Sequence, residues 1–304
     1  MMQKPEISRE SARQVLRSQF PSVDASSIEL LGEGWDFRAF VVDGRWIFRF
    51  PKSRESEQRL LTELRFLEDV AALLPLSVPR YLFCGTPAEW FPYHFAGYAM
   101  LPGTPAMSVE LSHSALIAVA VQLGRFLGSL HRFEVAHAIS LGLRSCIDDD
   151  TIRAAREGAL TDLASVRQTV DDNLYQRCAT FLRDDSRLPP EDEGPLRVLH
   201  NDLGDEHVLV QAETGVVTGV IDWTDAAVGD PALDFARLWA WQGEAFTKVM
   251  LDEYGLPADP LMLDRIRYRG VCTAVGTLFY GWRSGDDQYC NSGLAWLRRI
   301  FSEA

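Results

Sequence analysis

The chain has 304 residues, and its 47% hydrophobic content can build a substantial core, so we expect one large or two closely joined domains. Its net charge of −13 disfavours binding to a nucleic-acid backbone, which needs a basic face, and suits a cationic small substrate better. The sequence has no uncharged apolar run of about 18 residues and no signal-peptide pattern, so we expect a cytoplasmic monomer with neither nucleic-acid nor membrane partners.

The first hundred residues predict a small unit of helices and antiparallel strands. Residues 8–20 begin with a helix-start signal at Ser8 and continue with apolar residues at helical spacing. Residues 28–51 alternate between apolar and polar and predict three strands, with a glycine-containing first turn and an Asp43-Gly44 turn after it. A helical period follows over 55–74, and the stretches RYLFCG and HFAGYAML predict two further strands.

Helical patterns dominate after the break at Pro102-Gly103. They cover 109–132, 148–185, 233–255 and 260–302, and only 198–222 reads as strand. We therefore expect an α+β protein with an N-terminal lobe over 1–100, a larger and mainly helical lobe over 101–304, and a hinge at about 98–103. Five cysteines without a C-x-x-C pair indicate reduced, mostly buried thiols.

A polar loop in the strand-like region is the strongest functional signal. The stretch VLHNDLGDEHVLV places polar residues between two short apolar runs, which predicts a tight loop on a rigid support. A second strand follows a turn at 213–215 and ends at Asp222, so the hairpin is expected to bring Asp202, His207 and Asp222 to one edge. Phosphoryl transfer needs a carboxylate that accepts the proton of the attacking hydroxyl and oxygen ligands for Mg²⁺. Asp202 suits the first role and Asp222 the second.

These motifs resemble those of the antibiotic kinases of the aminoglycoside and macrolide phosphotransferase family. The resemblance rests on His200 with Asp202, on Ile221-Asp222-Trp223, and on GDPALDFA with Asp230 and Asp234. It implies a bilobal protein-kinase-like fold, ATP or GTP as phosphate donor, Mg²⁺ as cofactor, and an antibiotic as substrate. His207 occupies the position where the family commonly has a metal-binding asparagine. The alternative is a packed histidine without a ligand.

The resemblance also assigns nucleotide-binding residues in the first lobe. Gly32 and Gly34 would let the first hairpin approach the phosphates, although two glycines are often just a turn. Arg49 stands where the family has a phosphate-contacting lysine, and Glu63 would hold it. Lys52 is a second candidate for that role, and an ordinary surface pair is the alternative for Arg49 and Glu63.

GYAMLPG resembles the segment that links the two lobes, where the backbone binds the purine. The resemblance assigns this role to Ala99 and Leu101, with Tyr98 at the back of the pocket. The choice between ATP and GTP stays open.

For the acceptor, acids and aromatics that could hold a polyamine sugar are the candidates: Asp205, Trp239, Trp241, Glu244, Tyr280, Trp282, Asp286 and Asp287. The tryptophans, at helical spacing, could equally be core residues. The stretches GEGWDFRAF, IFRFP and HFAGYAMLPG look most like the aminoglycoside 2″-phosphotransferases, so an aminoglycoside is the favoured substrate. A macrolide kinase, a kinase of a small metabolite and a pseudokinase remain the alternatives.

Overall fold

The computed structural model describes all of the chain except residues 1–6, 147–149, 192–193, 258 and 303–304. It separates into two compact units, each described by itself below. The first unit comprises Met1–Gly103 with Thr218–Asp225, and the second comprises Thr104–Val217 with Ala226–Ala304. Asp222 therefore belongs to the first unit, whereas Asp202 and His207 belong to the second. Whether the three meet at one edge stays a prediction.

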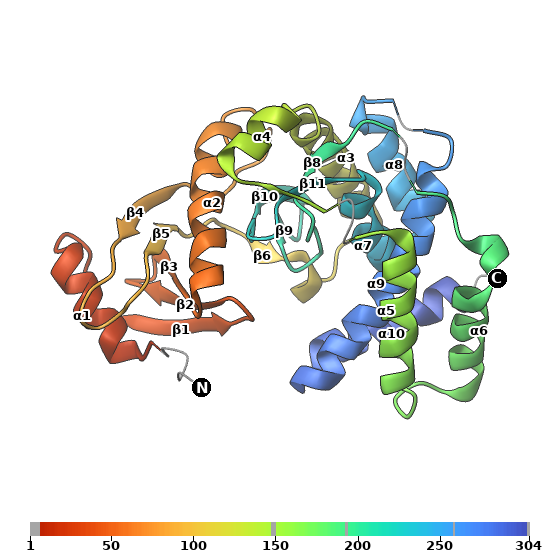
Figure 1. The fold of residues 1–304 in the computed structure, drawn as a ribbon, viewed down its shortest axis with the longest axis horizontal. Coiled ribbons are helices and arrows are strands. Elements are labelled where there is room, and N and C mark those ends of the chain that lie inside the picture. Colours follow the sequence, from red (N-terminus) through yellow and green to blue (C-terminus); the bar gives the residue numbers. More distant parts are fainter. Residues whose placement is uncertain (1–6, 147–149, 192–193, 258, 303–304) are drawn as a thin grey trace. The chain divides into compact units, whose positions relative to one another are not determined.

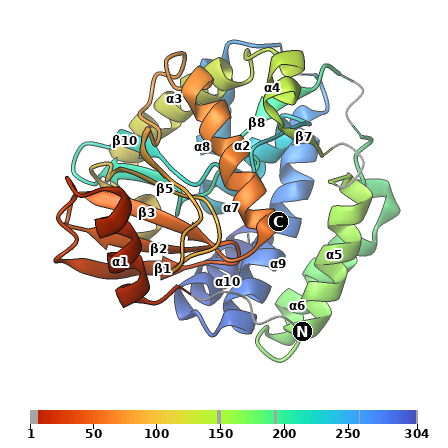
Figure 2. The same ribbon diagram turned by 60° about the vertical axis from the view of Figure 1, so that its left-hand side comes forward.

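The first unit is built on a five-stranded antiparallel sheet with the strand order β1-β2-β3-β5-β4 (Figures 1 and 2). The chain forms α1 (Arg9–Gln19), β1 (Ile28–Glu33), β2 (Phe37–Val42), β3 (Trp46–Pro51), α2 (Arg54–Val70), β4 (Tyr81–Gly85) and β5 (Phe95–Ala99). The strands and both helices predicted from the sequence are confirmed. Asp43 and Gly44 both have positive φ, and the backbone N–H of Arg45 donates to the Val42 carbonyl at 3.1 Å, which closes a tight turn between β2 and β3.

Alternation along the strands gives this sheet two different faces. One face carries an aromatic core of Phe40, Phe48, Phe50 and Phe95, which is buried together with apolar residues of α1. The other face carries Arg49 and packs against α2, where Leu60 is fully buried. An arginine on this second face therefore lies beneath a helix rather than in solvent.

Close packing on the aromatic face requires a glycine in β5. A Cβ added at Gly97 would lie 2.5 Å from the ring of Phe48, whereas one added at Gly276 in the second unit would meet nothing within 4 Å. Gly97→Ala is expected to lower the free energy of unfolding by about 1–3 kcal/mol through overpacking. Gly276→Ala, the control, should raise it by about 0.5–1 kcal/mol because alanine favours helix. Urea unfolding measures both, and equal effects would contradict the packing.

Residues 218–225 join the first unit through specific contacts. The backbone N–H of Val220 donates to Ser77 O at 2.9 Å, and Thr218 Oγ1 donates to the carbonyl of Pro102. Trp223 is fully buried, its ring centroid 6.0 Å from that of Phe66 in α2. These contacts fix Asp222 beside the α2 face of the sheet.

The second unit is mainly helical. Its helices are α3 (His113–Leu130), α4 (Val135–Leu141), α5 (Ile152–Ser165), α6 (Asp172–Arg183), α7 (Ala232–Gln242), α8 (Glu244–Tyr254), α9 (Met262–Ser284) and α10 (Asp287–Ser302), with 3₁₀ turns at Ala106–Ser108 and Asp185–Arg187. Helix α9 packs against α5, α7 and α10, and α5 lies beside α6 (Figure 2). One described helix, α3, is apolar and long enough to cross a membrane, but half of it is buried and it packs against α8. We interpret α3 as a core helix.

Short strands support the polar loop. They are β6 (Thr104–Pro105), β7 (Arg144–Ser145), β8 (Arg197–Leu199), β9 (Val208–Gln211), β10 (Val216–Val220) and β11 (Ala227–Gly229). They form two three-stranded sheets, β10-β9-β6 and β7-β11-β8. The expectation that only 198–222 is strand-like in this part of the chain was wrong, because β6, β7 and β11 lie outside it. The expectation of mostly buried cysteines is confirmed, since three of the five free cysteines are buried and only Cys84 is exposed.

Candidate active site

A buried carboxylate on α7 holds the loop that leads to Asp202. Asp234 is fully buried and accepts the backbone N–H groups of His200 at 2.9 Å and Asn201 at 2.7 Å. Asn201 has a φ of 66°, a left-handed conformation that is strained for a residue other than glycine and persists only where surrounding contacts compensate for the strain. The two hydrogen bonds from Asp234 hold the backbone immediately before Asp202.

Two further helices support this carboxylate. His131 at the end of α3 is buried, with Nε2 3.0 Å from Asp234 and Nδ1 2.6 Å from the Tyr254 hydroxyl of α8. If Nε2 donates to the carboxylate, Nδ1 accepts from the tyrosine, so all three groups are satisfied. The sequence marked Asp234 only as part of a motif and gave no signal for His131 or Tyr254.

Asp202 and His207 lie together in the second unit. The side chain of Asp202 is 43% exposed, so solvent and a substrate can reach it. His207 Nδ1 is 2.7 Å from the backbone oxygen of Asp202 and donates to it. With Nδ1 protonated, the lone pair of the neutral ring is on Nε2. Potential ligand atoms of Asp202, Glu206 and His207 lie within 4.8 Å of one another.

Arg237 on α7 supplies a positive charge beside the acids of this loop. The sequence analysis did not single it out. Its Nε donates to Glu206 Oε2 at 3.0 Å, its Nη2 lies at an ion-pair distance of 2.5 Å from Glu206 Oε1, and the guanidinium is 5.5 Å from the ring centroid of Trp296. Burial opposes ionisation of Glu206, but Arg237 lowers its pKa below the ordinary value. Asp205 is 2% exposed, and burial together with the Glu206 charge raises its pKa to about 7. Glu206 therefore neutralises Arg237.

In the first unit, Arg49 forms a buried ion-pair network. Its Nη1 donates to both oxygens of Glu63 at 2.7 and 2.9 Å, and its Nη2 donates to Asp222 Oδ1 at 3.0 Å. The side chains of Arg49 and Glu63 are only 7% and 0% exposed, so the alternative of an ordinary surface pair was wrong. Burial favours the neutral form of Arg49, but attraction to Glu63 raises its pKa well above the ordinary value.

Glu63 is held by more than the arginine. The hydroxyls of Tyr81 at 2.7 Å and Thr224 at 3.1 Å also donate to its carboxylate. Burial raises the pKa of Glu63, and the charge of Arg49 opposes that rise. The network therefore fixes the guanidinium between one carboxylate of α2 and the partly exposed Asp222.

Removing one partner of this network is expected to cost stability. Glu63→Ala leaves the buried charge of Arg49 with Asp222 alone, and breaking a buried pair costs about 3–5 kcal/mol. The double variant Arg49→Met/Glu63→Met buries no charge and should lose less than the single variant. Urea unfolding of the three proteins measures this, and a double variant less stable than Glu63→Ala would contradict a buried ion pair.

The other residues assigned to the nucleotide lie in the same unit. Gly32 and Gly34 are exposed, and a Cβ at either would meet nothing within 4 Å, so space lies beside this turn. Lys52 donates to the Gly34 carbonyl at 2.7 Å, which ties it to the hairpin turn rather than to Glu63.

The predicted hinge residues lie at the end of β5. Tyr98 is buried on the face of the sheet that carries Arg49, with its ring 5.3 Å from that of Tyr81. Ala99 ends β5 opposite Trp46, and Leu101 follows it half-buried. The contacts of Ala99 and Leu101 with the purine therefore stay a prediction.

The residues expected to bind the acceptor are dispersed. Trp239 is buried against Gly270, which fits the alternative of a core residue. Glu244 pairs with Arg267 and with Lys248, at 2.5 and 2.7 Å. Asp286 accepts the backbone N–H of Gln288 at the start of α10. Trp282 and Asp287 are exposed, and Tyr280 packs edge-on against Tyr289.

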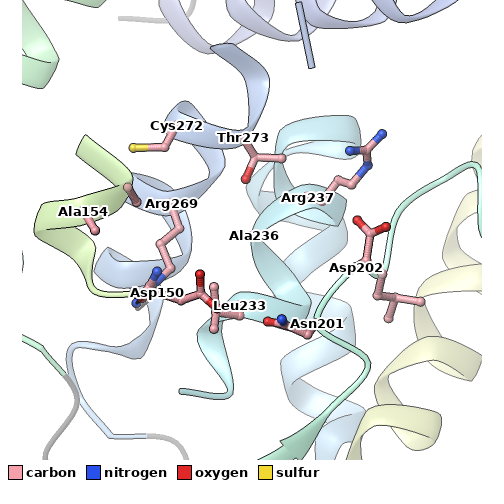
Figure 3. A pocket seen from close by; sticks show the side chains of 12 residues that line it. Asp150, Ala154, Asn201, Asp202, Leu233, Ala236, Arg237, Arg269, Cys272 and Thr273 are labelled. Carbon is pink, nitrogen blue, oxygen red and sulfur yellow. Dashed lines mark hydrogen bonds between the residues drawn. The ribbon is translucent and has the colours of Figure 1, made fainter. Parts of the chain in front are cut away.

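A cavity of about 310 Å³ in the second unit lies beside Asp202 (Figure 3). Helix α5 contributes Ala154 and Ala155, α7 contributes Leu233, Ala236 and Arg237, and α9 contributes Arg269, Cys272 and Thr273. The described lining includes none of the eight residues predicted to bind the acceptor. Two arginines stand there instead.

A family model described as the phosphotransferase enzyme family APH matches residues 27–266. The chain belongs to this family. The chain is 28% identical over 252 residues to the uncharacterized protein YcbJ of Bacillus subtilis strain 168, and the match covers 78% of each chain.

Solved structures of two antibiotic kinases are similar to this chain over nearly its whole length. The GDP complex of wild-type aminoglycoside 2'-phosphotransferase-IIIa is 27% identical, with a TM-score of 0.76 over 97% of this chain and 99% of the other. A macrolide 2'-phosphotransferase type I is 25% identical, with a TM-score of 0.64 over 97% and 99%. The expected family and its protein-kinase-like fold are thereby confirmed.

Proposed function

We propose that this phosphotransferase moves the γ-phosphoryl group of ATP or GTP to a hydroxyl of a small molecule, with Asp202 as the base. The observation that carries the proposal is Asp202 itself, which is accessible, follows a backbone held by buried Asp234, and faces a cavity. A carboxylate so placed can orient a hydroxyl and accept its proton as the phosphorus–oxygen bond forms. A cytoplasmic location and a monomeric state remain part of the proposal.

The nucleotide is assigned to the first unit. The space beside the backbone at Gly32 and Gly34 can admit phosphate, and the fixed guanidinium of Arg49 offers a permanent positive charge. An arginine fork held by Glu63 can replace the usual lysine, because it reaches both a carboxylate and a phosphate. A pseudokinase would have no need to combine this network with an accessible Asp202.

Magnesium is assigned to Asp222 and His207. The Asp222 side chain is 45% exposed and offers carboxylate oxygen, which Mg²⁺ prefers. His207 offers the Nε2 lone pair, because its Nδ1 donates to the Asp202 carbonyl, although imidazole nitrogen is a poorer ligand for Mg²⁺ than oxygen. Bound magnesium would neutralise charge on the nucleotide phosphates.

His207→Asn tests the second assignment. It places an oxygen ligand where the family commonly has one, so kcat is expected to stay within about tenfold of the parent. His207→Phe keeps an aromatic ring but has no ligand atom and should reduce kcat by at least about 100-fold. Steady-state kinetics at several Mg²⁺ concentrations separate the variants. Equal activity of both would remove His207 from the metal site.

Sequence and structure favour different classes of acceptor. The sequence favours an aminoglycoside, and the similarity to aminoglycoside 2'-phosphotransferase-IIIa supports that choice, with a macrolide or a small metabolite as the alternatives. The described lining beside Asp202 contains none of the acids predicted to hold a polyamine, which are Asp205, Glu244, Asp286 and Asp287. This favours a different acceptor class.

Purified protein with Mg²⁺ and either ATP or GTP tests the general proposal. Nucleotide binding by calorimetry and Asp202-dependent transfer to water or to an added acceptor are the expected results. Absence of both nucleotide binding and transfer would overturn the phosphotransferase assignment.

A further inference from the structure

Arg269 on α9 is a buried arginine that lines two cavities. The residue is 4% exposed, and it borders both the 310 Å³ cavity beside Asp202 and a second cavity of about 140 Å³. Figure 3 shows Arg269 and Asp202 on opposite sides of the first cavity, with the hydroxyl of Thr273 directed between them. A molecule that fills this cavity can touch the catalytic carboxylate at one end and the guanidinium at the other.

The hydrogen-bonding capacity of Arg269 is poorly used. A guanidinium has five N–H donors, yet in the described part of the chain Arg269 makes one hydrogen bond, from Nη2 to the Asp150 carbonyl at 2.9 Å. Its buried Nε has no hydrogen-bond partner among the described residues. Buried donors without acceptors are costly, so a site of this kind is expected to hold an oxygen-bearing ligand or water.

The nearest carboxylates are engaged elsewhere. Asp230 is 3.7 Å from Arg269 Nε, beyond hydrogen-bond distance, and receives a 3.0 Å hydrogen bond from Arg265. Glu191 is 3.9 Å from Nη2 and accepts the backbone N–H of Ile152 at 2.8 Å. These acids balance the charge of Arg269 without using its donors, so a second full negative charge would meet repulsion there.

The described lining of the cavity contains ionisable groups of both signs. Asp150 and Asp202 face Arg237 and Arg269, and Arg237 is already paired with Glu206. The remaining walls are small or apolar, including Ala154, Leu233 and Ala236. Arginine side chains only donate hydrogen bonds, so in the described lining the ammonium groups of a polyamine would find side-chain carboxylates only at Asp150 and Asp202.

Size limits the ligand further. The volume of about 310 Å³ corresponds to about ten waters at roughly 30 Å³ each. It lies at the lower end of the roughly 300–1,000 Å³ typical of ligand pockets. One sugar-sized ring fits these dimensions better than a three-ring aminoglycoside or a macrolide.

We propose that the acceptor is an uncharged, oxygen-rich molecule of single-sugar size, which receives hydrogen bonds from Arg269 and Thr273 while one hydroxyl meets Asp202. The proposal rests on the proposed function, since it names the acceptor of the same transfer. In that step the acceptor oxygen bonds to the γ-phosphorus, the bond to the nucleoside diphosphate breaks, and the hydroxyl proton passes to Asp202.

Four sets of acceptors test the charge requirement: neutral hexoses, pentoses and inositols; glucosamine; gluconate; and kanamycin. Each is incubated with the protein, Mg²⁺ and ATP or GTP, and phosphorylated product is detected by mass spectrometry. Transfer to a neutral compound, with a KM that changes less than about twofold between 50 and 500 mM salt, is expected because no charge pair contributes to binding. Transfer confined to charged acceptors, or to none of the neutral ones, overturns the proposal.

Substitutions then locate the binding site. Arg269→Met should raise the KM of the neutral acceptor at least about tenfold with kcat changed less than about threefold, since binding rather than chemistry is lost. The KM of the Arg269→Lys variant should lie between those of the parent and the Arg269→Met variant. Unchanged KM in a folded Arg269→Met protein overturns the assignment.

A second pair of variants avoids the buried charge. Ala154 is exposed on α5 and lines the cavity, so Ala154→Leu should fill space and raise KM. Gly158→Leu, one turn further along α5 and with nothing within 4 Å of an added Cβ, is the control and should leave KM unchanged. Equal KM values for the two variants overturn the placement of the acceptor in this cavity.

Asp202-dependent hydrolysis of the nucleotide distinguishes a wrong acceptor class from a wrong phosphotransferase assignment. Hydrolysis without transfer to any neutral acceptor overturns only the acceptor class. Loss of both nucleotide binding and hydrolysis overturns the phosphotransferase assignment itself.

Discussion

Asp202→Asn is expected to lower kcat by roughly 10²- to 10⁴-fold, the range in which a positioned general base contributes. The amide keeps the size of the side chain but cannot accept the hydroxyl proton. Because the nucleotide is assigned to residues of the first unit, its dissociation constant should change less than about twofold. Single-turnover kinetics with a saturating acceptor and calorimetric nucleotide titration measure the two quantities.

The control for this variant should keep the same loop intact. Glu206→Gln changes a neighbouring carboxylate that is bonded to Arg237 and is not assigned to proton transfer. It should reduce kcat far less than Asp202→Asn does. If Asp202→Asn retained more than about one tenth of the parent kcat, the role of Asp202 as base would be untenable.

The sequence predicted the first unit well because its strands alternate visibly. Phe48 and Phe50 face the aromatic core while Arg49 between them faces α2, and this period of two was readable without a structure. The helical regions were less accurate, since 233–255 and 260–302 each contain two helices. Gly243 and Gly285, both with positive φ, lie between the paired helices. The glycines were present in the sequence, but the apolar period continues across them.

The candidate site was predictable where a motif carries it. His200, Asp202 and Asp222 lie in short stretches whose residue types point to phosphoryl transfer. Arg237 and Arg269 belong to helices in which a charged residue ordinarily marks the solvent side, and only tertiary packing half-buries the first and buries the second. Negative net charge therefore suggested a polyamine acceptor, whereas the described walls beside Asp202 combine two acids with two arginines. The acceptor that we propose therefore rests on local charge, which composition does not report.

Asp222→Ala is expected to abolish measurable transfer, a loss of at least about 10³-fold in kcat. The carboxylate is the oxygen ligand assigned to Mg²⁺, and without the cation the protein must offset the phosphate charge with Arg49 alone. Folding should survive, because Arg49 keeps both oxygens of Glu63 at 2.7 and 2.9 Å. The variant therefore separates activity from stability, in contrast to Glu63→Ala, and kcat and urea unfolding measured together reveal the difference.

A neighbouring acid supplies the matched control for the metal assignment. Asp225 lies three residues further along the same segment, is 38% exposed, and pairs with Arg59 at 3.1 Å. Asp225→Ala removes an equal charge from a similarly exposed position, so it should change kcat less than about threefold, as expected for a surface pair. A higher Mg²⁺ concentration should not restore the kcat of Asp222→Ala, which lacks the ligand, and should not change that of Asp225→Ala. Equal losses from both substitutions would show that general charge near Arg49, rather than a ligand at Asp222, supports the transfer.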